Sequence, residues 1–363
     1  MKVANVEVFR LDMPLDAPPT PHRPALSESA EVANPLSGYD RFKRHRDLWY
    51  PKGIDMVWCK ITLADGTYGL GTTYFGWATA GIIREHLGPN LIGEDALDVA
   101  RLNEMLWRMT NLYGATGLAS YAISALDLAL WDAKGKLLGQ PVMDLVGGAK
   151  GDSLFCYATC NDVDWNRKLG FHAFKLACPF GPADGDEGLD GNEALVAETR
   201  ALVGPDAPLM LDCWMAFDVD YTVRLAARLA PYKLHWIEEC LLPDDLGAHV
   251  ELRRALPDQT YATGEHWTTV APFKWALDHD LADVYQPDIL WCGGLTVCME
   301  IARLAHARGK QVILHNGGRG PFGPQFSFAS PATPWLEYYI DAAPGVSLED
   351  AGRMPGRRIP QEG

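Results

Sequence analysis

Six ionisable residues occupy the same kind of place in the sequence, at or just after the end of a short apolar run. In LMLDCWM, residues 209–215, Asp212 directly follows three apolar residues. An ionised carboxylate in apolar surroundings is costly unless a partner compensates its charge. The full set, with 23 to 37 residues between neighbours, is Lys175, Asp212, Glu238, Glu265, Asp288 and His315.

Three of these acids predict a metal site. If the apolar runs are successive strands of a parallel barrel, their C-terminal ends meet at one mouth. Two carboxylates about 4 Å apart repel by roughly 4 kcal/mol at an effective dielectric near 20. Asp212, Glu238 and Glu265 together therefore need a cation, and an all-oxygen set with open positions favours Mg²⁺. The alternative for each acid alone is a helix N-cap or loop position, which weakens when three occur in register.

The other members of the set predict acid–base chemistry. His315 is expected to be a base, with its imidazole oriented and made more basic by Asp288; the alternative is a histidine bonded to backbone at a strand end. Lys175 is expected to face a substrate carboxylate or the metal-bound acids, and its alternative is a lysine at the barrel rim with its head in solvent. Glu239 is ambiguous, and the metal is assigned to Glu238 because that residue directly follows the apolar run.

From about residue 153, short apolar runs alternate with amphipathic helical patterns. This alternation predicts an α/β fold with a parallel sheet, and the number of units favours a modified (β/α)8-type TIM barrel. Strands are expected at residues 153–158, 172–177, 208–212, 234–238, 260–264, 283–287 and 311–315.

The N-terminal part has a different pattern and predicts an α+β capping domain. Residues 3–12 and 56–63 resemble two antiparallel strands, and residues 78–139 have helical spacing. The segment between the strands is too long for a simple connection, so we interpret it as a lid or an insert. The expected domains are a cap at 1–130 with a lid at 14–53, a barrel at 131–335, and a C-terminal segment at 336–363 that packs back on the cap.

Composition limits the partners. The chain has 363 residues, 48% of them apolar, and a net charge of −15, which argues against binding to nucleic acid or a membrane surface. No apolar stretch is long enough for a transmembrane helix, and no signal-peptide pattern is present at the N-terminus. The eight cysteines are scattered without C-x-x-C spacing, so reduced thiols and a cytoplasmic location are expected.

The motifs together resemble the enolase superfamily, in its mandelate racemase-like subgroup. The resemblance extends over nearly the whole chain and is most specific in four stretches. Residues 181–188, GPADGDEG, add a similarity to the L-rhamnonate dehydratases of that subgroup. The four stretches are LMLDCWM at 209–215, WIEEC at 236–240, GEH at 264–266 and QPDILWCGGLT at 286–296.

The resemblance implies roles for residues at the predicted mouth. It implies Mg²⁺ on the three acids, a substrate carboxylate held by the metal and Lys175, and His315 as the base supported by Asp288. It makes Glu337 a stabiliser of the intermediate and places His266 in the pocket. The enzymes it resembles are often homo-oligomers.

Two residues of the predicted lid, His22 and Arg46, match substrate-binding positions of the dehydratases only loosely. Arg46 lies in the basic run RFKRHRDLWY. The alternative for this run is a solvated charged surface.

The sequence departs from the family at two points. The second lysine of the racemase K-x-K motif is absent, because residues 175–177 are Lys-Leu-Ala. This argues against two-base racemisation. The dehydratases follow the catalytic histidine with Gly-Ser-Ser, whereas this chain has HNGGRG with Arg319, which alters the pocket wall.

The expected function is that of a Mg²⁺-dependent dehydratase of a sugar acid, such as an L-rhamnonate-like aldonate. His315 removes the α proton and the 3-hydroxyl leaves, which yields a 2-keto-3-deoxy acid. One alternative is an epimerase or cycloisomerase of a sugar acid or lactone. A further alternative is a sugar-acid sensor without catalytic activity.

Overall fold

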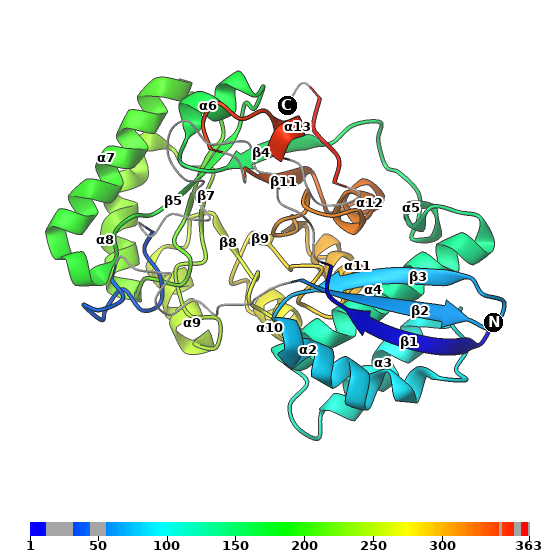
Figure 1. The fold of residues 1–363 in the computed structure, drawn as a ribbon. Coiled ribbons are helices and arrows are strands. Elements are labelled where there is room, and N and C mark those ends of the chain that lie inside the picture. The colour runs from blue at the N-terminus through cyan, green and yellow to red at the C-terminus, as the bar shows by residue number, and fades with distance from the viewer. Residues whose placement is uncertain (12–31, 44–55, 341–342, 352–356, 362–363) are drawn as a thin grey trace.

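The computed structural model describes residues 1–11, 32–43, 56–340, 343–351 and 357–361 (Figure 1). It comprises an N-terminal α+β cap and a barrel of parallel strands. In Figure 1 the cap, coloured blue to cyan, lies beside the side of the barrel that carries α10 and α11. None of the helices in these ranges is long and apolar enough to cross a membrane.

The cap is built on a three-stranded antiparallel sheet in the order β1-β2-β3. In β2, alternate residues are buried, which is the pattern of a strand with one face on a core. The helices α3 and α4 supply the other half of this core. The expected pairing of the first two strands is confirmed. The strands are β1 (Val3–Phe9), β2 (Val57–Leu63) and β3 (Tyr68–Thr73), and the helices are α2 (Gly76–Ile82), the π-helix η2 (Ile83–Leu87), η3 (Pro89–Leu91), α3 (Val99–Thr110) and α4 (Leu118–Leu138).

Helix α4 approaches β3 unusually closely because glycine faces it. A Cβ atom at Gly69 would lie 1.9 Å from the Ala129 carbonyl oxygen, and one at Gly71 would lie 2.0 Å from the Ala125 carbonyl oxygen. Only glycine permits this separation. The helix continues to Leu138, and Ala133 still belongs to the cap core. The expected cap boundary at residue 130 therefore falls inside a helix and is corrected to its end.

The barrel is an eight-stranded parallel sheet in the order β10-β9-β8-β7-β6-β5-β4-β11. The strand–helix alternation predicted from the sequence is confirmed. The strands are β4 (Phe155–Thr159), β5 (Phe174–Ala177), β6 (Leu209–Asp212), β7 (Trp236–Glu238), β8 (Tyr261–Thr263), β9 (Val284–Tyr285), β10 (Gln311–Val312) and β11 (Trp335–Tyr339). The helices between them are α6 (Val163–Lys168), α7 (Gly185–Val203), α8 (Val219–Leu229), α9 (Leu246–Ala255), α10 (Ala271–Asp278), α11 (Leu295–His306) and α12 (Phe322–Ala329), with short turns η4 (Pro182–Asp184) and η5 (Ala230–Tyr232) and flanking helices α5 (Val142–Leu145) and α13 (Leu348–Ala351).

The expected end of the barrel at residue 335 was wrong, because the last strand continues beyond it. Strand β11 pairs in parallel with β4, so the barrel extends beyond residue 335. The strand ladder is open between β10 and β11, where the Gly318 N–H donates to the Glu337 carbonyl oxygen at 2.8 Å. In the described part of 336–363, Leu348 joins the barrel core and Arg357 lies over the Tyr338 ring at 4.3 Å. This segment packs on the barrel rather than only on the cap.

The inside of the barrel is filled below the mouth by a small apolar cluster. Its buried members are Tyr157, Ala173, Met210, Trp236, Ala262, Val284 and Ile313. The Trp236 indole N–H donates to Glu238 Oε2 at 2.8 Å, so the apolar floor ends in a hydrogen bond to the polar layer above it.

A buried polar network joins the cap to the loop after β9. Asp127 on α4 accepts from Asn103 Nδ2 at 2.8 Å and from the Thr296 N–H at 3.0 Å. Asn103 also donates to the Gly293 carbonyl oxygen at 2.9 Å. Burial raises the pKa of Asp127 to about 6, against the effect of these hydrogen bonds. Since Ser120 Oγ donates to the Trp291 carbonyl oxygen at 2.7 Å, the cap fixes the whole loop.

Replacing Asp127 with alanine should lower the free energy of unfolding by about 2 kcal/mol or more, because two buried donors would lose their acceptor. Urea denaturation followed by circular dichroism measures this. The control is Glu104→Ala, which removes an exposed carboxylate paired with Arg108 on α3 and should leave the midpoint unchanged. If the urea midpoints of Asp127→Ala and Glu104→Ala were equal, the buried network would not contribute to stability as expected.

Candidate active site

The three predicted metal-binding acids meet at the C-terminal mouth of the barrel. Asp212 and Glu238 are partners in the parallel ladder between β6 and β7, and Glu265 follows β8. One carboxylate oxygen from each of the three lies within 4.8 Å of the others. Glu238 and Glu265 are buried, whereas Asp212 is partly exposed.

The electrostatics of this cluster fit a bound cation. Burial raises the pKa of Glu238 to about 8, although Lys175 opposes the rise. Burial also raises the pKa of Asp212 and of Glu265, and neighbouring carboxylates add to both shifts. A divalent cation would relieve this repulsion, and a set of three carboxylates suits the hard Mg²⁺ ion.

Lys175 lies under the acids rather than at the rim. Its Nζ atom contacts a Glu238 oxygen and lies 2.8 Å from Glu337 Oε1 and 3.4 Å from Asp212 Oδ2. Burial alone would lower the pKa of Lys175, but Glu238 and Glu337 raise it well above its usual value. The side chain is 1% exposed, so the alternative of a solvent-facing rim lysine does not hold.

Glu337 on β11 is held in its ionised form. Its Oε1 accepts from Thr159 Oγ1 at 2.5 Å, and its Oε2 accepts from the Asn316 N–H at 2.7 Å. Burial opposes ionisation, but Lys175 and His315 lower the pKa of Glu337 to about 2. The last strand thus contributes a fixed negative charge beside the lysine.

His315 and Asp288 form a hydrogen-bonded pair. His315 Nδ1 lies 2.8 Å from Asp288 Oδ2, and its other ring nitrogen, Nε2, lies 3.8 Å from Glu265 Oε2 and 3.1 Å from Asn316 Nδ2. Burial lowers the pKa of His315, but Glu265 and Asp288 raise it to about 10. The ring is bonded to side chains, so the alternative of a histidine bonded to backbone does not hold.

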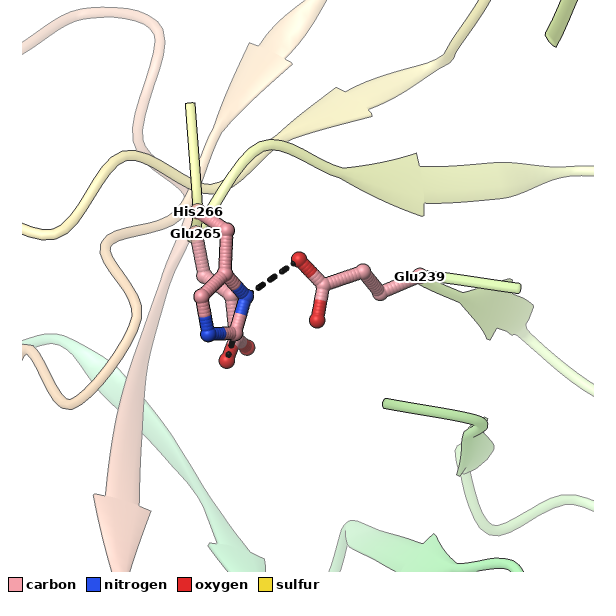
Figure 2. Close-up of side chains that lie close together, drawn as sticks. All are labelled: Glu239, Glu265 and His266. Carbon is pink, nitrogen blue, oxygen red and sulfur yellow. Dashed lines mark hydrogen bonds and ion pairs between the residues drawn. The ribbon is translucent and has the colours of Figure 1, made fainter. Parts of the chain in front are cut away.

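A second histidine–carboxylate pair lies on the other side of Glu265. Figure 2 shows His266 Nδ1 facing Glu239, with Oε1 at 2.7 Å, while Glu265 Oε1 lies at 3.4 Å. Burial lowers the pKa of His266, but Glu239 and Glu265 raise it to about 9. These three side chains also have metal-ligand geometry, but the 2.7 Å hydrogen bond satisfies the pair without an ion.

From the sequence Glu239 was ambiguous and was expected only to lie beside the metal ligands, so its pairing with His266 was not predicted. In an extended strand, its side chain would point away from that of Glu238. Its φ of 42° turns the chain so that both carboxylates reach the mouth. The signal in the sequence is the succession of Glu-Glu and Glu-His at two adjacent strand ends.

The surroundings of the site come partly from the cap. His22 and Arg46 lie outside the described residues. Within 32–43, the Ala33 N–H donates to the Cys178 carbonyl oxygen at 2.8 Å, so this end of the predicted lid lies at the mouth. Arg319 stacks over the Tyr74 ring at 5.7 Å and borders a cavity of about 280 Å³ between the cap sheet and the loop after β10.

Comparison with known proteins agrees with this architecture. Residues 52–147 match the mandelate racemase / muconate lactonizing enzyme N-terminal domain, and residues 162–357 match the enolase C-terminal domain-like family. An L-rhamnonate dehydratase of Saccharopolyspora erythraea is 39% identical over 310 residues, which are 85% of this chain and 79% of that protein.

Two solved structures show the range of similar proteins. Rhamnonate dehydratase of Gibberella zeae complexed with Mg has a TM-score of 0.88 and 32% identity, over 95% of this chain and 85% of that chain. A racemase of Streptomyces coelicolor A3(2) with bound magnesium has a TM-score of 0.71 and 29% identity, over 78% of this chain and 86% of that chain.

A cap, a parallel barrel and acidic residues at successive strand ends define an enolase-type enzyme fold. This chain belongs to the enolase superfamily, with the N- and C-terminal domains of its mandelate racemase / muconate lactonizing enzyme group.

Mg²⁺ should raise the melting temperature, because binding to the folded state alone adds about 2.7 kcal/mol at 100 times the Kd. Asp212→Asn should abolish this shift, while the metal-free variant melts no lower than the metal-free wild type because one repelling charge is gone. Differential scanning calorimetry with and without Mg²⁺ measures both effects.

The matched control is Asp206→Asn, which changes an exposed acid before the opposite end of β6 and should keep the full shift. If Mg²⁺ raised the melting temperature of Asp212→Asn as much as that of the wild type, Asp212 would not be a metal ligand.

Proposed function

We propose that this protein is a Mg²⁺-dependent dehydratase of a sugar acid, with an L-rhamnonate-like aldonate as the substrate class. The observation that carries the proposal is the position of His315 Nε2, which lies 3.8 Å from the Glu265 carboxylate of the predicted metal cluster. The dehydratase names of the relatives at 39% and 32% identity support the same reaction class.

Asp212, Glu238 and Glu265 would hold the metal ion. When bound, Mg²⁺ offsets the negative charge that develops on the substrate carboxylate as the neighbouring carbon loses its proton. The Trp236 and Gln286 side chains each donate to Glu238 Oε2 at 2.8 Å, which fixes this ligand in place.

His315 acts as the base at Nε2. Asp288 holds the opposite nitrogen, so that the ring has one orientation and Nε2 faces the reaction volume. Abstraction requires neutral imidazole. A cation among the carboxylates offsets the negative field that raises the pKa of His315, and so favours the neutral form.

The elimination then needs a proton on the leaving hydroxyl group, and the protonated His315 can return the one it removed. The C2–H and C3–O bonds break, a C2–C3 double bond forms, and the 3-hydroxyl leaves as water with the proton that His315 had accepted. The resulting enol tautomerises to a 2-keto-3-deoxy acid. Lys175 and Glu337 set the charge at the carboxylate end of the substrate, because their 2.8 Å ion pair lies beside the acids.

The opposite face of the pocket supports elimination rather than racemisation. Ala177 lies two residues after Lys175 on β5 and pairs with Asp212 in the ladder. A methyl group at this position cannot accept a proton. The lysine that β5 does carry, Lys175, is paired with Glu238 and Glu337, so among the described residues we assign the base to His315.

Incubation with Mg²⁺ and a panel of aldonates that includes L-rhamnonate should produce 2-keto acid, measured by reaction with semicarbazide. His315→Asn should lower kcat by about 10²–10⁴-fold, the usual contribution of an acid–base group. The control His306→Asn changes an exposed histidine at the end of α11 and should leave kcat unchanged.

Full activity of His315→Asn would contradict the assigned base. Solvent deuterium in recovered substrate without keto acid would indicate an epimerase or other isomerase instead. Melting shifts with sugar acids but no turnover across the panel would indicate a sensor.

A further inference from the structure

Two histidine–carboxylate pairs flank one metal-ligand candidate. Glu265 presents Oε1 to His266 Nδ1 at 3.4 Å and Oε2 to His315 Nε2 at 3.8 Å. Trp291 is adjacent to both imidazoles, with ring centroids 4.9 Å from His315 and 5.5 Å from His266. The mechanism above uses the His315 pair and assigns nothing to Glu239.

Glu239 is held rigidly. Its N–H donates to the Ala262 carbonyl oxygen at 2.9 Å, and its carbonyl oxygen accepts from the Met215 N–H at 2.6 Å. The residue is 3% exposed. Its φ of 42° is a backbone conformation that residues other than glycine rarely adopt. A buried carboxylate in a strained backbone is costly, and its one described side-chain hydrogen bond is to His266.

This bond determines which nitrogen of His266 faces the pocket. Glu239 and Glu265 are both acceptors when ionised, so Nδ1 is the nitrogen that carries a proton toward them. Among the described residues, Nε2 has no hydrogen-bond partner, and the side chain is 22% exposed at the mouth. Nε2 is therefore available to a polar group of a bound molecule.

We propose that Glu239 is a positioning residue that fixes His266 so that Nε2 contacts a hydroxyl group of the substrate. The inference rests on the proposed function, because a polyhydroxy acid supplies such a group beside the metal cluster. In this proposal Glu239 acts through the imidazole, to which its Oε1 is hydrogen-bonded.

Glu239 also competes with Glu265 for His266, whose Nδ1 lies 2.7 Å from Glu239 Oε1 and 3.4 Å from Glu265 Oε1. Without Glu239, Glu265 is the remaining acceptor near Nδ1, and the ring is free to turn toward it. Such a turn would withdraw Nε2 from the substrate. The loss should therefore appear in substrate affinity and in discrimination among hydroxyl patterns.

The test is a double-mutant cycle. Glu239→Ala should raise KM for the best aldonate about tenfold, the effect of losing about 1.4 kcal/mol of binding, with a smaller change in kcat. Glu239→Gln keeps an acceptor oxygen at the same place and should stay within about threefold of wild type. In the His266→Asn background, Glu239→Ala should have almost no further effect, because the residue it positions is gone.

A panel of mono-deoxy aldonates locates the hydroxyl group. The analogue that lacks the hydroxyl group contacted by His266 should have the same KM with the wild type and with Glu239→Ala. The Mg²⁺-induced melting shift should be retained in Glu239→Ala, which separates positioning from loss of the metal site. The matched control Glu251→Ala changes an exposed acid on α9 and should leave KM unchanged.

Wild-type KM in Glu239→Ala, or additive effects in the double variant, would overturn this inference while leaving the proposed dehydration intact. A loss in Glu239→Gln as large as in Glu239→Ala would also overturn it, because the acceptor would then not be what matters. Failure of wild type to turn over any sugar acid is a different outcome and would overturn the proposed function itself.

Discussion

The site depends on the balance between crowded carboxylates and a single buried ammonium group. Lys175 contacts Glu238, lies 2.8 Å from Glu337 and 3.4 Å from Asp212. One positive charge cannot neutralise these three acids together with Glu265. Burial raises the pKa of Glu238 to about 8, and the neighbouring carboxylates add to the rise. The remaining negative charge suits the mouth to a cation, and it also raises the pKa of the neighbouring imidazoles. The proposed metal binding and the proposed base strength therefore both follow from the same excess charge.

The scaffold makes this excess charge tolerable. Lys175, Asp212, Glu238 and Glu337 come from four different strands, so backbone hydrogen bonds of the barrel hold the positions from which these side chains reach one another. Below the acids, Trp236 closes the apolar interior and also donates to Glu238. Beside them, α4 of the cap holds the loop that carries Trp291, through Ser120 and Asp127. The cap thus supports the chemistry from a distance as well as covering the mouth.

Much of this could be predicted from the sequence, because strand ends in a parallel barrel converge. The positions of Asp212, Glu238 and Glu265 follow from apolar runs of regular spacing, and the structure brings these residues together. Glu239 could not be placed, since its orientation depends on a positive φ that no periodicity reveals. Strand β11 was missed because WLEYY carries a glutamate at its centre, which interrupts the apolar run, and that residue forms part of the site. The end of the cap was misplaced because the continuous burial of α4 ends at Leu130, although the helix itself runs on to Leu138.

The distribution of the candidate site residues over several strands has a consequence for the divergence of related enzymes. A residue such as Ala177 can be exchanged without moving the backbone of any other strand, since its neighbours are held by their own ladder contacts. A single substitution can then change one side chain of the site, while the residues proposed to bind the cation and the substrate carboxylate stay in position. One architecture is accordingly similar both to a rhamnonate dehydratase of Gibberella zeae and to a racemase of Streptomyces coelicolor A3(2).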